Sequence, residues 1–272
     1  GFNVYVSGAP GTGKKTVVRS MVREVAVGQP VPEDWCYVNN FRDPDRPQAI
    51  SLPAGMGREF QRDIEHLVAS LREDFPKAFQ SKDYEDQHRP LEEEFSAAHA
   101  RLGAELEEQA QAQDFQLKTT RVGFVLLPFY QGKALDTEAF AALPPAIQEE
   151  IKRKEKIVDE VIRVFRQKLR LAQEAVNRKV DELNQRVARY TSEQLFEGLM
   201  GKYQTYPKVL GFIHMLQKDV QDNFEGFLTT QDTSAGGAGG AAQFTARYAV
   251  NLLVDNEEAR GGPVIEEGNP TY

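Results

Sequence analysis

Apolar side chains recur every three or four positions through most of residues 57–228, and this spacing predicts helices with one apolar face. Two stretches alternate spacings of three and four, which is typical of a coiled-coil seam. The longer seam predicts one helix over residues 146–190, opened by Pro144 and Pro145. Pro207 interrupts the last helical stretch, residues 193–228. The expected apolar faces are Phe60, Ile64, Leu67, Leu71 and Phe75; His88, Leu91, Phe95, Ala98, Leu102 and Leu106; Val158, Ile162, Phe165, Leu169, Ala172, Val176, Val180, Leu183, Val187 and Tyr190; and Val209, Phe212, Ile213, Leu216, Val220 and Phe224.

Both ends of the chain have the pattern of α/β protein. At the start, β-rich residues 2–6 lead through a glycine-rich turn into an apolar-periodic helix over 16–25. Short strands are expected at 35–38, 49–53 and 247–255. The sequence therefore predicts an α/β domain interrupted by a large all-α coiled-coil insertion, with helix dominating overall. The expected divisions are residues 1–56 and 244–272 for the α/β domain, 57–228 for the insertion, and 229–243 for a flexible Gly/Ala-rich linker.

A β-hairpin is expected inside the helical insertion, at about residues 123–135. Two apolar runs flank the turn sequence Gln131-Gly132-Lys133. At the end of a helical arm, the hairpin would present Phe124, Leu126, Phe129 and Tyr130. Exposed aromatic side chains there indicate a contact surface for other chains. The alternative is a small core, in which these side chains pack on neighbouring helices.

Charge indicates which helices pair. Residues 85–108 hold eight acidic residues and two arginines, a net charge of −6. Residues 151–189 hold twelve basic and six acidic residues, a net charge of +6. Antiparallel pairing of the two helices is the interpretation we favour, because opposite charges attract and exclude like-charged partners. The alternative is two solvated faces that never meet.

Composition narrows the class of protein. The net charge is −8 and the pI about 5.2, which argues against a nucleic-acid-binding protein. The single cysteine, Cys36, excludes a disulfide within the chain and fits a reducing, cytoplasmic compartment. No run approaches the ~18 apolar residues of a membrane span, and the N-terminus lacks the features of a signal peptide. Because no initiator Met is present, we expect a fragment of a longer protein.

The segment that carries chemistry is the loop 8–14, Gly-Ala-Pro-Gly-Thr-Gly-Lys, between the first expected strand and helix. It has the phosphate-binding pattern GxxxxGK in the strand–loop–helix context that this pattern requires. Gly8, Gly11 and Gly13 let backbone N–H groups converge on phosphate oxygens, and the helix N-terminus adds partial positive charge. Lys14 would reach the β- and γ-phosphates of a nucleotide. The alternative is a glycine-rich helix entry without a ligand.

One position departs from this pattern. The residue after Lys14 is normally Ser or Thr, whose hydroxyl coordinates Mg²⁺. Here it is Lys15, and Thr16 follows one place later. A charged lysine cannot ligate the metal, although its ammonium group can partly replace the charge of the ion. The loop therefore predicts ATP or ADP binding through Gly8, Gly11, Gly13, Lys14, Lys15 and Thr16, with Mg²⁺ dependence in doubt.

No other catalytic or metal site emerges. The end of the last strand, Asp255-Asn256, imitates the acidic pair of an ATPase, but Asn256 cannot act as a base. We interpret the pair as a strand-end turn, with a metal ligand at Asp255 as the alternative. The four histidines, His66, His88, His99 and His214, lack Cys or acidic partners at ligand spacing and are expected at surface or seam positions. Neither a Ser-His-Asp nor a Cys-His arrangement can be argued.

Several blocks of the sequence resemble the N-terminal ATPase module of bacterial Lon-like proteases, Lon-related peptidases whose AAA+ module carries a long coiled-coil insertion. The resemblance extends along essentially the whole chain, and the blocks on either side of the insertion are its specific part. These blocks are Phe2–Val6, Gly8–Lys14, Pro32–Phe41, Asp43–Pro47, Leu52–Gly55, Arg247–Tyr248, Val250–Asn256 and Gly268–Tyr272.

The resemblance implies an AAA+-like P-loop module of a hexameric, cytoplasmic serine endopeptidase for protein quality control, one that degrades unfolded or damaged proteins. In that family a Ser–Lys dyad in a separate C-terminal domain cuts the peptide bond, so the dyad would lie beyond Tyr272. This chain would then serve substrate engagement, homo-oligomer assembly and nucleotide binding. Some Lon-like proteins work without ATP, so Lys15 leaves the use of nucleotide open.

Two other functions fit parts of the pattern. A mechanical ATPase of the chromosome-maintenance type also has a P-loop before a coiled-coil excursion, although the short arm and the acidity argue against it. A non-catalytic, substrate-holding module with a vestigial P-loop fits Lys15. The retained Lys14 and loop glycines argue against complete decay of the loop.

Overall fold

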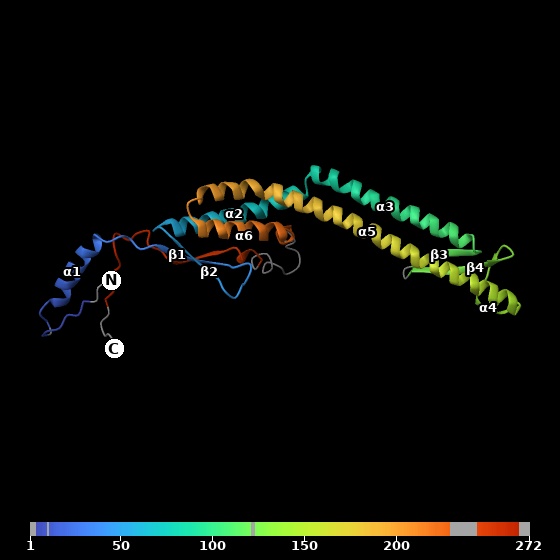
Figure 1. The fold of residues 1–272 in the computed structure, drawn as a ribbon, viewed down its shortest axis with the longest axis horizontal. Helices are drawn as coiled ribbons and strands as arrows, with labels where there is room; N and C mark the ends of the chain where they lie inside the picture. The colour runs from blue at the N-terminus through green and yellow to red at the C-terminus, as the bar shows by residue number, and fades with distance from the viewer. Residues whose placement is uncertain (1–3, 10, 121–122, 229–243, 267–272) are drawn as a thin grey trace. The chain divides into compact units, whose positions relative to one another are not determined.

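The computed structural model describes residues 4–9, 11–120, 123–228 and 244–266, and Figure 1 shows its elements. The chain forms two compact units. Unit 1 consists of residues 1–78 and 188–272, and unit 2 of residues 79–187. The expected linker 229–243 and the last block of the resemblance, 268–272, lie outside the described residues.

Unit 1 contains a three-stranded antiparallel sheet. Its order is β2-β1-β6, from β1 (Asp34–Val38), β2 (Gln48–Leu52) and β6 (Val250–Val254). Tyr37 lies opposite Ala49 on one side and Asn251 on the other, and the β6 register shifts near Trp35. The strands expected at 35–38 and 49–53 are therefore confirmed to within one residue, and the one expected at 247–255 is confirmed over residues 250–254. The sheet also joins segments that are about 200 residues apart in the sequence.

Helices cover one face of this sheet (Figure 1). They are α2 (Met56–Phe79) and α6 (Pro207–Asp222), and the short α7 (Glu225–Leu228) follows α6 and packs its Phe227 against Phe75 of α2. The apolar stripes expected on α2 and around α6 are buried, and the Phe60 ring meets Tyr203 at 5.3 Å and Phe212 at 6.0 Å. The helices over 56–78 and 188–228, which the sequence analysis assigned to the insertion, thus belong to the same unit as the strands.

The first helix, α1 (Lys14–Val27), forms as expected, but the strand before it does not. Residues 4–9 adopt no regular secondary structure, and Val4 and Tyr5 expose 62% and 76% of their surface. Residues 2 and 3 of the expected strand lie outside the described residues. These residues have the composition of a strand, but a strand needs a hydrogen-bonded neighbour, and no described strand lies beside them. The predicted strand is therefore wrong for residues 4–6. α1 likewise buries none of its side chains.

Unit 2 is built on antiparallel pairing of α3 (Lys82–Gln111) with α5 (Pro145–Lys202), the latter continuing into unit 1. Contacts run in opposite directions along the two helices: Tyr84 donates to Asn184 at 2.8 Å, Lys179 donates to Glu94 at 2.7 Å, and Lys168 lies 3.8 Å from Glu105. The predicted pairing of the acidic and basic helices is confirmed.

The expected seam on α5 is only partly correct. Val158, Phe165, Val176 and Leu183 are buried, whereas Tyr190 is 82% exposed. Tyr190 lies beyond residue 187, where unit 2 ends, so α3 no longer runs beside it. The strict three-and-four spacing therefore overestimates the length of the paired segment.

A small sheet completes unit 2. It consists of β3 (Phe115–Thr120), β4 (Gly123–Tyr130) and β5 (Lys133–Ala134), followed by α4 (Thr137–Ala141). The predicted hairpin is confirmed, with Gln131 and Gly132 at φ 51° and 79° in its turn. The longer partner of β4 is β3, which the sequence analysis missed.

The aromatic side chains of this hairpin are half-buried rather than exposed. Phe124 meets Phe165 edge to face at 5.7 Å, and Leu126 packs against the same core. Phe129 and Tyr130 are also partly covered. The expectation that these side chains are presented to other chains is therefore wrong for Phe124 and Leu126, which belong to the alternative, a small core packed on α3 and α5.

Candidate functional site

The glycine-rich loop before α1 is wrapped around its own lysine. Gly8, Gly11 and Gly13 have φ values of 146°, 80° and 69°, which side chains with a Cβ rarely adopt. The Nζ of Lys14 donates to the carbonyl oxygen of Ala9 and, at 3.1 Å, to the Oγ1 of Thr12. The Lys14 ammonium is thus held by oxygen atoms of the loop itself.

The start of α1 adds further positive charge. Gly13 is the N-cap and supplies no side-chain hydrogen bond to the first turn, so its N–H groups remain open to an acceptor. Lys15 is exposed and lies 3.9 Å from Glu266. Thr16 is exposed on the first turn. The structure therefore holds Lys14 against the loop at Gly8, Ala9 and Thr12, whereas Lys15 lies near Glu266, and α1 buries no side chain.

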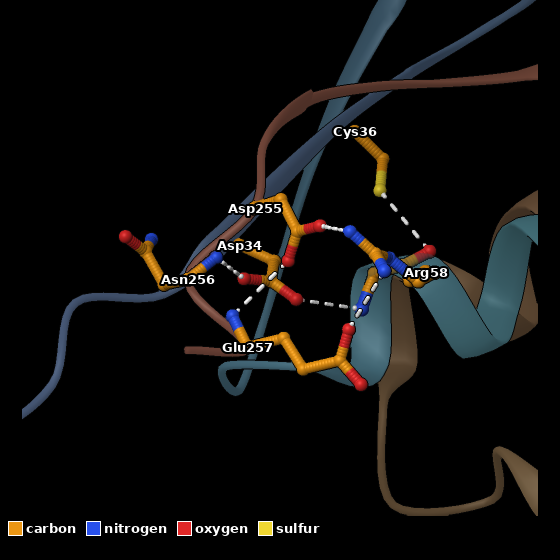
Figure 2. A network of polar contacts seen from close by, with 7 residues as sticks. Asp34, Cys36, Arg58, Asp255, Asn256 and Glu257 are labelled. Carbon is orange, nitrogen blue, oxygen red and sulfur yellow. Dashed lines mark hydrogen bonds and ion pairs between the residues drawn. The ribbon is translucent and has the colours of Figure 1, made fainter. Parts of the chain in front are cut away.

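A buried carboxylate ties the sheet to α2 (Figure 2). Asp34 is 0% exposed, and its Oδ2 accepts from the backbone N–H of Gly57 at 2.9 Å while its Oδ1 accepts from that of Asn256 at 2.7 Å. These bonds join the start of β1, the first turn of α2 and the segment after β6. Gly57 is required here, because a Cβ would lie 2.8 Å from Asp34 Cβ and from a Leu252 methyl carbon.

Asp255 and Asn256 form a strand-end turn, as the sequence analysis favoured. Asp255 pairs with Arg58 and its Oδ1 accepts from the backbone N–H of Glu257 at 3.0 Å. That backbone hydrogen bond, followed by the Arg58 guanidinium, lowers the pKa of Asp255. The Nδ2 of Asn256 donates to the carbonyl oxygen of Glu33 at 2.9 Å. Both side chains are thus occupied in holding the end of β6 in place.

The remaining titratable groups also have structural surroundings. Burial, and secondarily the nearby Asp34 carboxylate, raise the pKa of Cys36 to about 11, so its thiol stays protonated. His88 lies half-buried at a seam position, and His66, His99 and His214 are exposed, as expected. Across the described ranges, no three His, Cys, Asp or Glu side chains are grouped as a metal site.

The second face of the unit 1 sheet is apolar and uncovered by any described helix. Along β1 the buried and exposed positions alternate, which leaves Trp35 and Tyr37 44% and 41% exposed. On β6, Leu253 and Val254 are 60% and 43% exposed, and Val254 lies opposite Trp35. These four side chains are called the open sheet face below. Sequence reasoning missed it, although strict alternation with Asp34 in phase with Cys36 signals a strand with one solvated face.

A groove of about 570 Å³ continues from this face. Only Tyr37 belongs to both, and the groove is otherwise lined by Val38, Asn39, Phe41, Pro44, Pro47, Ala246, Arg247, Ala249 and Asn251. Its lining combines aromatic rings and prolines with the amides of Asn39 and Asn251. Such a surface can contact apolar side chains while its amides bond to a peptide backbone.

One wall of the groove is fixed by Asp219. Tyr248 donates to Asp219 Oδ2 at 2.8 Å, and Arg247 pairs with Asp219 Oδ1. The Arg247 guanidinium also lies 5.9 Å from the ring of Phe41 and 5.5 Å from that of Phe244. Burial, and then the hydrogen bond to Asp219, raise the pKa of Tyr248. Asp219 thus holds both Arg247 and Tyr248 in place, and the Arg247 guanidinium is already paired with a carboxylate of the protein.

Comparison with known proteins gives one family. A family model described as the Lon-like LonC helical domain matches residues 34–67, which comprise β1, β2 and the first half of α2. No curated protein matches the chain. Among the described helices, none is both long enough and apolar enough to cross a membrane. The family match, which falls on the Asp34 network and half of the open sheet face, supports a Lon-related protein.

Proposed function

We propose that this chain engages unfolded polypeptide for a Lon-like endopeptidase, through the open sheet face and the adjoining groove. The observation that carries the proposal is the exposure of Trp35 and Tyr37 on a sheet whose other face is covered by helices. A solvated sheet face is normally polar, and contiguous exposed apolar side chains mark an interaction surface. The family match to the same strand supplies the protease context.

The chemistry of the partner follows from that of the surface. An unfolded chain exposes apolar side chains and unpaired backbone N–H and C=O groups together. The open sheet face offers two aromatic rings beside Leu253 and Val254, and β6 is an edge strand of the sheet. An extended segment can pair with such an edge, because the backbone on its outer side has no strand partner among the described residues. Recognition of this kind does not depend on one sequence.

The test uses the single tryptophan, Trp35, as its own reporter. Titration with a reduced, carboxymethylated protein that cannot refold is expected to change Trp35 fluorescence saturably. The double variant Tyr37→Ser, Leu253→Ser should bind at least tenfold more weakly. The control is Tyr190→Ser, which removes a more exposed tyrosine from α5. Equal weakening by the variant and the control would refute the proposal.

A second proposed function is nucleotide binding by the loop 8–14, as in an AAA+-like P-loop module. The observation that favours it is local: a loop with three glycines at positive φ holds the Lys14 ammonium on Ala9 and Thr12, beside Gly8, at an uncapped helix start. The loop and Lys14 would hold the phosphates of ATP or ADP, and Lys15 would supply charge where Mg²⁺ usually sits. In calorimetric titration, Lys14→Ala should bind ADP at least tenfold more weakly than wild type. The control is Lys208→Ala, at the start of another helix, and its ADP affinity should equal that of wild type.

Equal ADP affinities in all three proteins would instead support a vestigial loop. Titration with and without Mg²⁺ separates the remaining cases, since Lys15 predicts binding that needs little metal. Within the same proposal, copies assemble into a cytoplasmic ring such as a hexamer, and a Ser–Lys dyad outside these 272 residues cuts the peptide bond. The alternative of a chromosome-type mechanical ATPase would require DNA binding, which the net charge of −8 disfavours.

A further inference from the structure

Helix α5 carries a second apolar seam within unit 2, apart from the one that meets α3. Ile157, Val164 and Leu171 recur at a spacing of seven and are 46%, 38% and 53% exposed. Side chains seven apart lie nearly above one another, because two helical turns take about 7.2 residues. Val161 and Ala175 lie on the same side of the helix, but Val161 packs against the unit 2 core and Lys168 occupies the position between Val164 and Leu171. The exposed aliphatic side chains therefore form a narrow stripe with a spacing of seven. This is the spacing with which one helix packs against another.

The second seam is separate from the pairing already described. The α3-facing positions include Val158, Ile162 and Phe165, which are buried in the unit 2 core. Ile157 and Val164 directly precede two buried positions and therefore point about 100° away from them. Val161 packs against the unit 2 core, but Ile157, Val164 and Leu171 stay 46%, 38% and 53% exposed, so these three aliphatic side chains have room for a further helix.

Charges beside the seam are self-complementary in one direction only. Arg153 and Glu160 lie before its midpoint, Val164, and Lys168 and Glu174 lie after it. If a second copy runs antiparallel with the two Val164 side chains adjacent, Glu160 lies opposite Lys168, and Arg153 lies next to Glu174. A parallel copy places each charge beside its own counterpart, which is unfavourable. These side chains are exposed, and the contacts that they make now, such as Glu160 with Arg163, are surface pairs that can be shared or exchanged.

We propose that two copies of this chain pair antiparallel through α5, about a two-fold axis at Val164. The occupant of the seam is thus the same seam of a second copy, and the interface is isologous. A ring of six copies contains three such pairs. The inference rests on the proposed assembly of copies but not on polypeptide or nucleotide binding.

Cysteine cross-linking in the full chain tests both the contact and its direction. The native Cys36 is buried with a raised pKa, so introduced cysteines are the reactive thiols. Val164→Cys should form a disulfide-linked dimer at least tenfold faster than the control Arg166→Cys, which lies two residues away on another side of the helix. When mixed, Ile157→Cys and Leu171→Cys should link mainly to each other, whereas each alone should link slowly.

Two results would overturn the proposal. One is cross-linking of Val164→Cys at the rate of Arg166→Cys. The other is faster linking of Ile157→Cys to itself than to Leu171→Cys, which would indicate parallel pairing. Sedimentation of Val164→Glu adds a check without cysteines, because it should lower the dimer fraction while Arg166→Glu leaves it unchanged. Trp35 fluorescence with unfolded polypeptide should be the same in Val164→Glu as in wild type, so the failure of one proposal is distinguishable from the failure of the other.

Discussion

Removing the Asp34 carboxylate is expected to be the most damaging single polar substitution in unit 1. In Asp34→Ala, the backbone N–H of Gly57 is left fully buried without an acceptor, while that of Asn256 is only partly buried. An unsatisfied buried donor costs about 1–3 kcal/mol, and hydrogen bonds to a charged group are at the upper end. We assign roughly 2–3 kcal/mol to Gly57 and about 1 kcal/mol to Asn256, where water can partly replace the carboxylate. The expected loss is therefore about 3–4 kcal/mol.

Urea unfolding followed by Trp35 fluorescence measures this loss, because Trp35 is next to Asp34 on β1. Asp34→Asn should lose only about 1–2 kcal/mol, since its amide oxygen can still accept from Gly57. The control Asp45→Ala removes an exposed carboxylate and should change stability by less than about 0.5 kcal/mol. If Asp34→Ala unfolds at the same urea concentration as Asp45→Ala, the network in Figure 2 does not stabilise unit 1.

Three further predictions concern the same unit. Gly57→Ala should destabilise unit 1 by at least about 2 kcal/mol in urea unfolding, because the new Cβ lies 2.8 Å from neighbouring carbons. The control Gly211→Ala, which has open space around it, should be neutral or slightly stabilising. Equal effects of the two substitutions would contradict the close packing at Gly57. Burial, and then hydrogen bonds to Asp63 and Asp219, favour the neutral phenols of Tyr203 and Tyr248 and raise their pKa values. Their contribution to the free energy of unfolding is therefore fully present below pH 10 and is lost as the pH rises above it. Unfolding measured between pH 9 and 11 should show a shallower decline for Tyr248→Phe than for wild type, and an unchanged decline would refute this cause. Because Cys36 is buried with its pKa raised to about 11, a thiol reagent at pH 8 should label it at least a hundredfold more slowly in native protein than in urea, and comparable rates would show that β1 is open.

Elements with strong periodicity could be predicted from the sequence. The α2 and α6 stripes are buried as expected, since each supplies a continuous apolar face to one core. The pairing of α3 with α5 followed from net charges of opposite sign, and ion pairs such as Lys179–Glu94 connect them. These predictions hold because helix periodicity and net charge are local properties of the chain.

Strands were predicted less well, because a strand depends on a distant partner. Residues 4–6 have strand-like composition without a described neighbour, whereas β3, residues 115–120, alternates apolar and polar side chains over only four residues and is fixed by pairing with β4. Asp34 was also missed, although its position in phase with Cys36 and Val38 indicates a buried carboxylate. The sequence could not show which groups donate hydrogen bonds to Asp34, since the backbone N–H groups of Gly57 and Asn256 meet it only after folding.

The candidate site shows the same division. The loop glycines and Lys14 were recognisable because the phosphate-binding pattern is contiguous in the sequence. The open sheet face is assembled from two strands about 200 residues apart, so neither strand reveals it alone. Trp35 and Tyr37 are exposed because helices cover only the other face of the sheet, which the strand pattern at 35–38 does not show.

Photo-cross-linking from the open sheet face tests the central claim most directly. A benzophenone amino acid would replace Tyr37 in one protein and Tyr190 in another, and each would be irradiated with a reduced, carboxymethylated protein. Polypeptide engagement by the open face predicts cross-linked product from position 37, suppressed by excess unlabelled unfolded protein, and little from position 190. Equal yields from the two positions, or none from position 37, would contradict the proposed function.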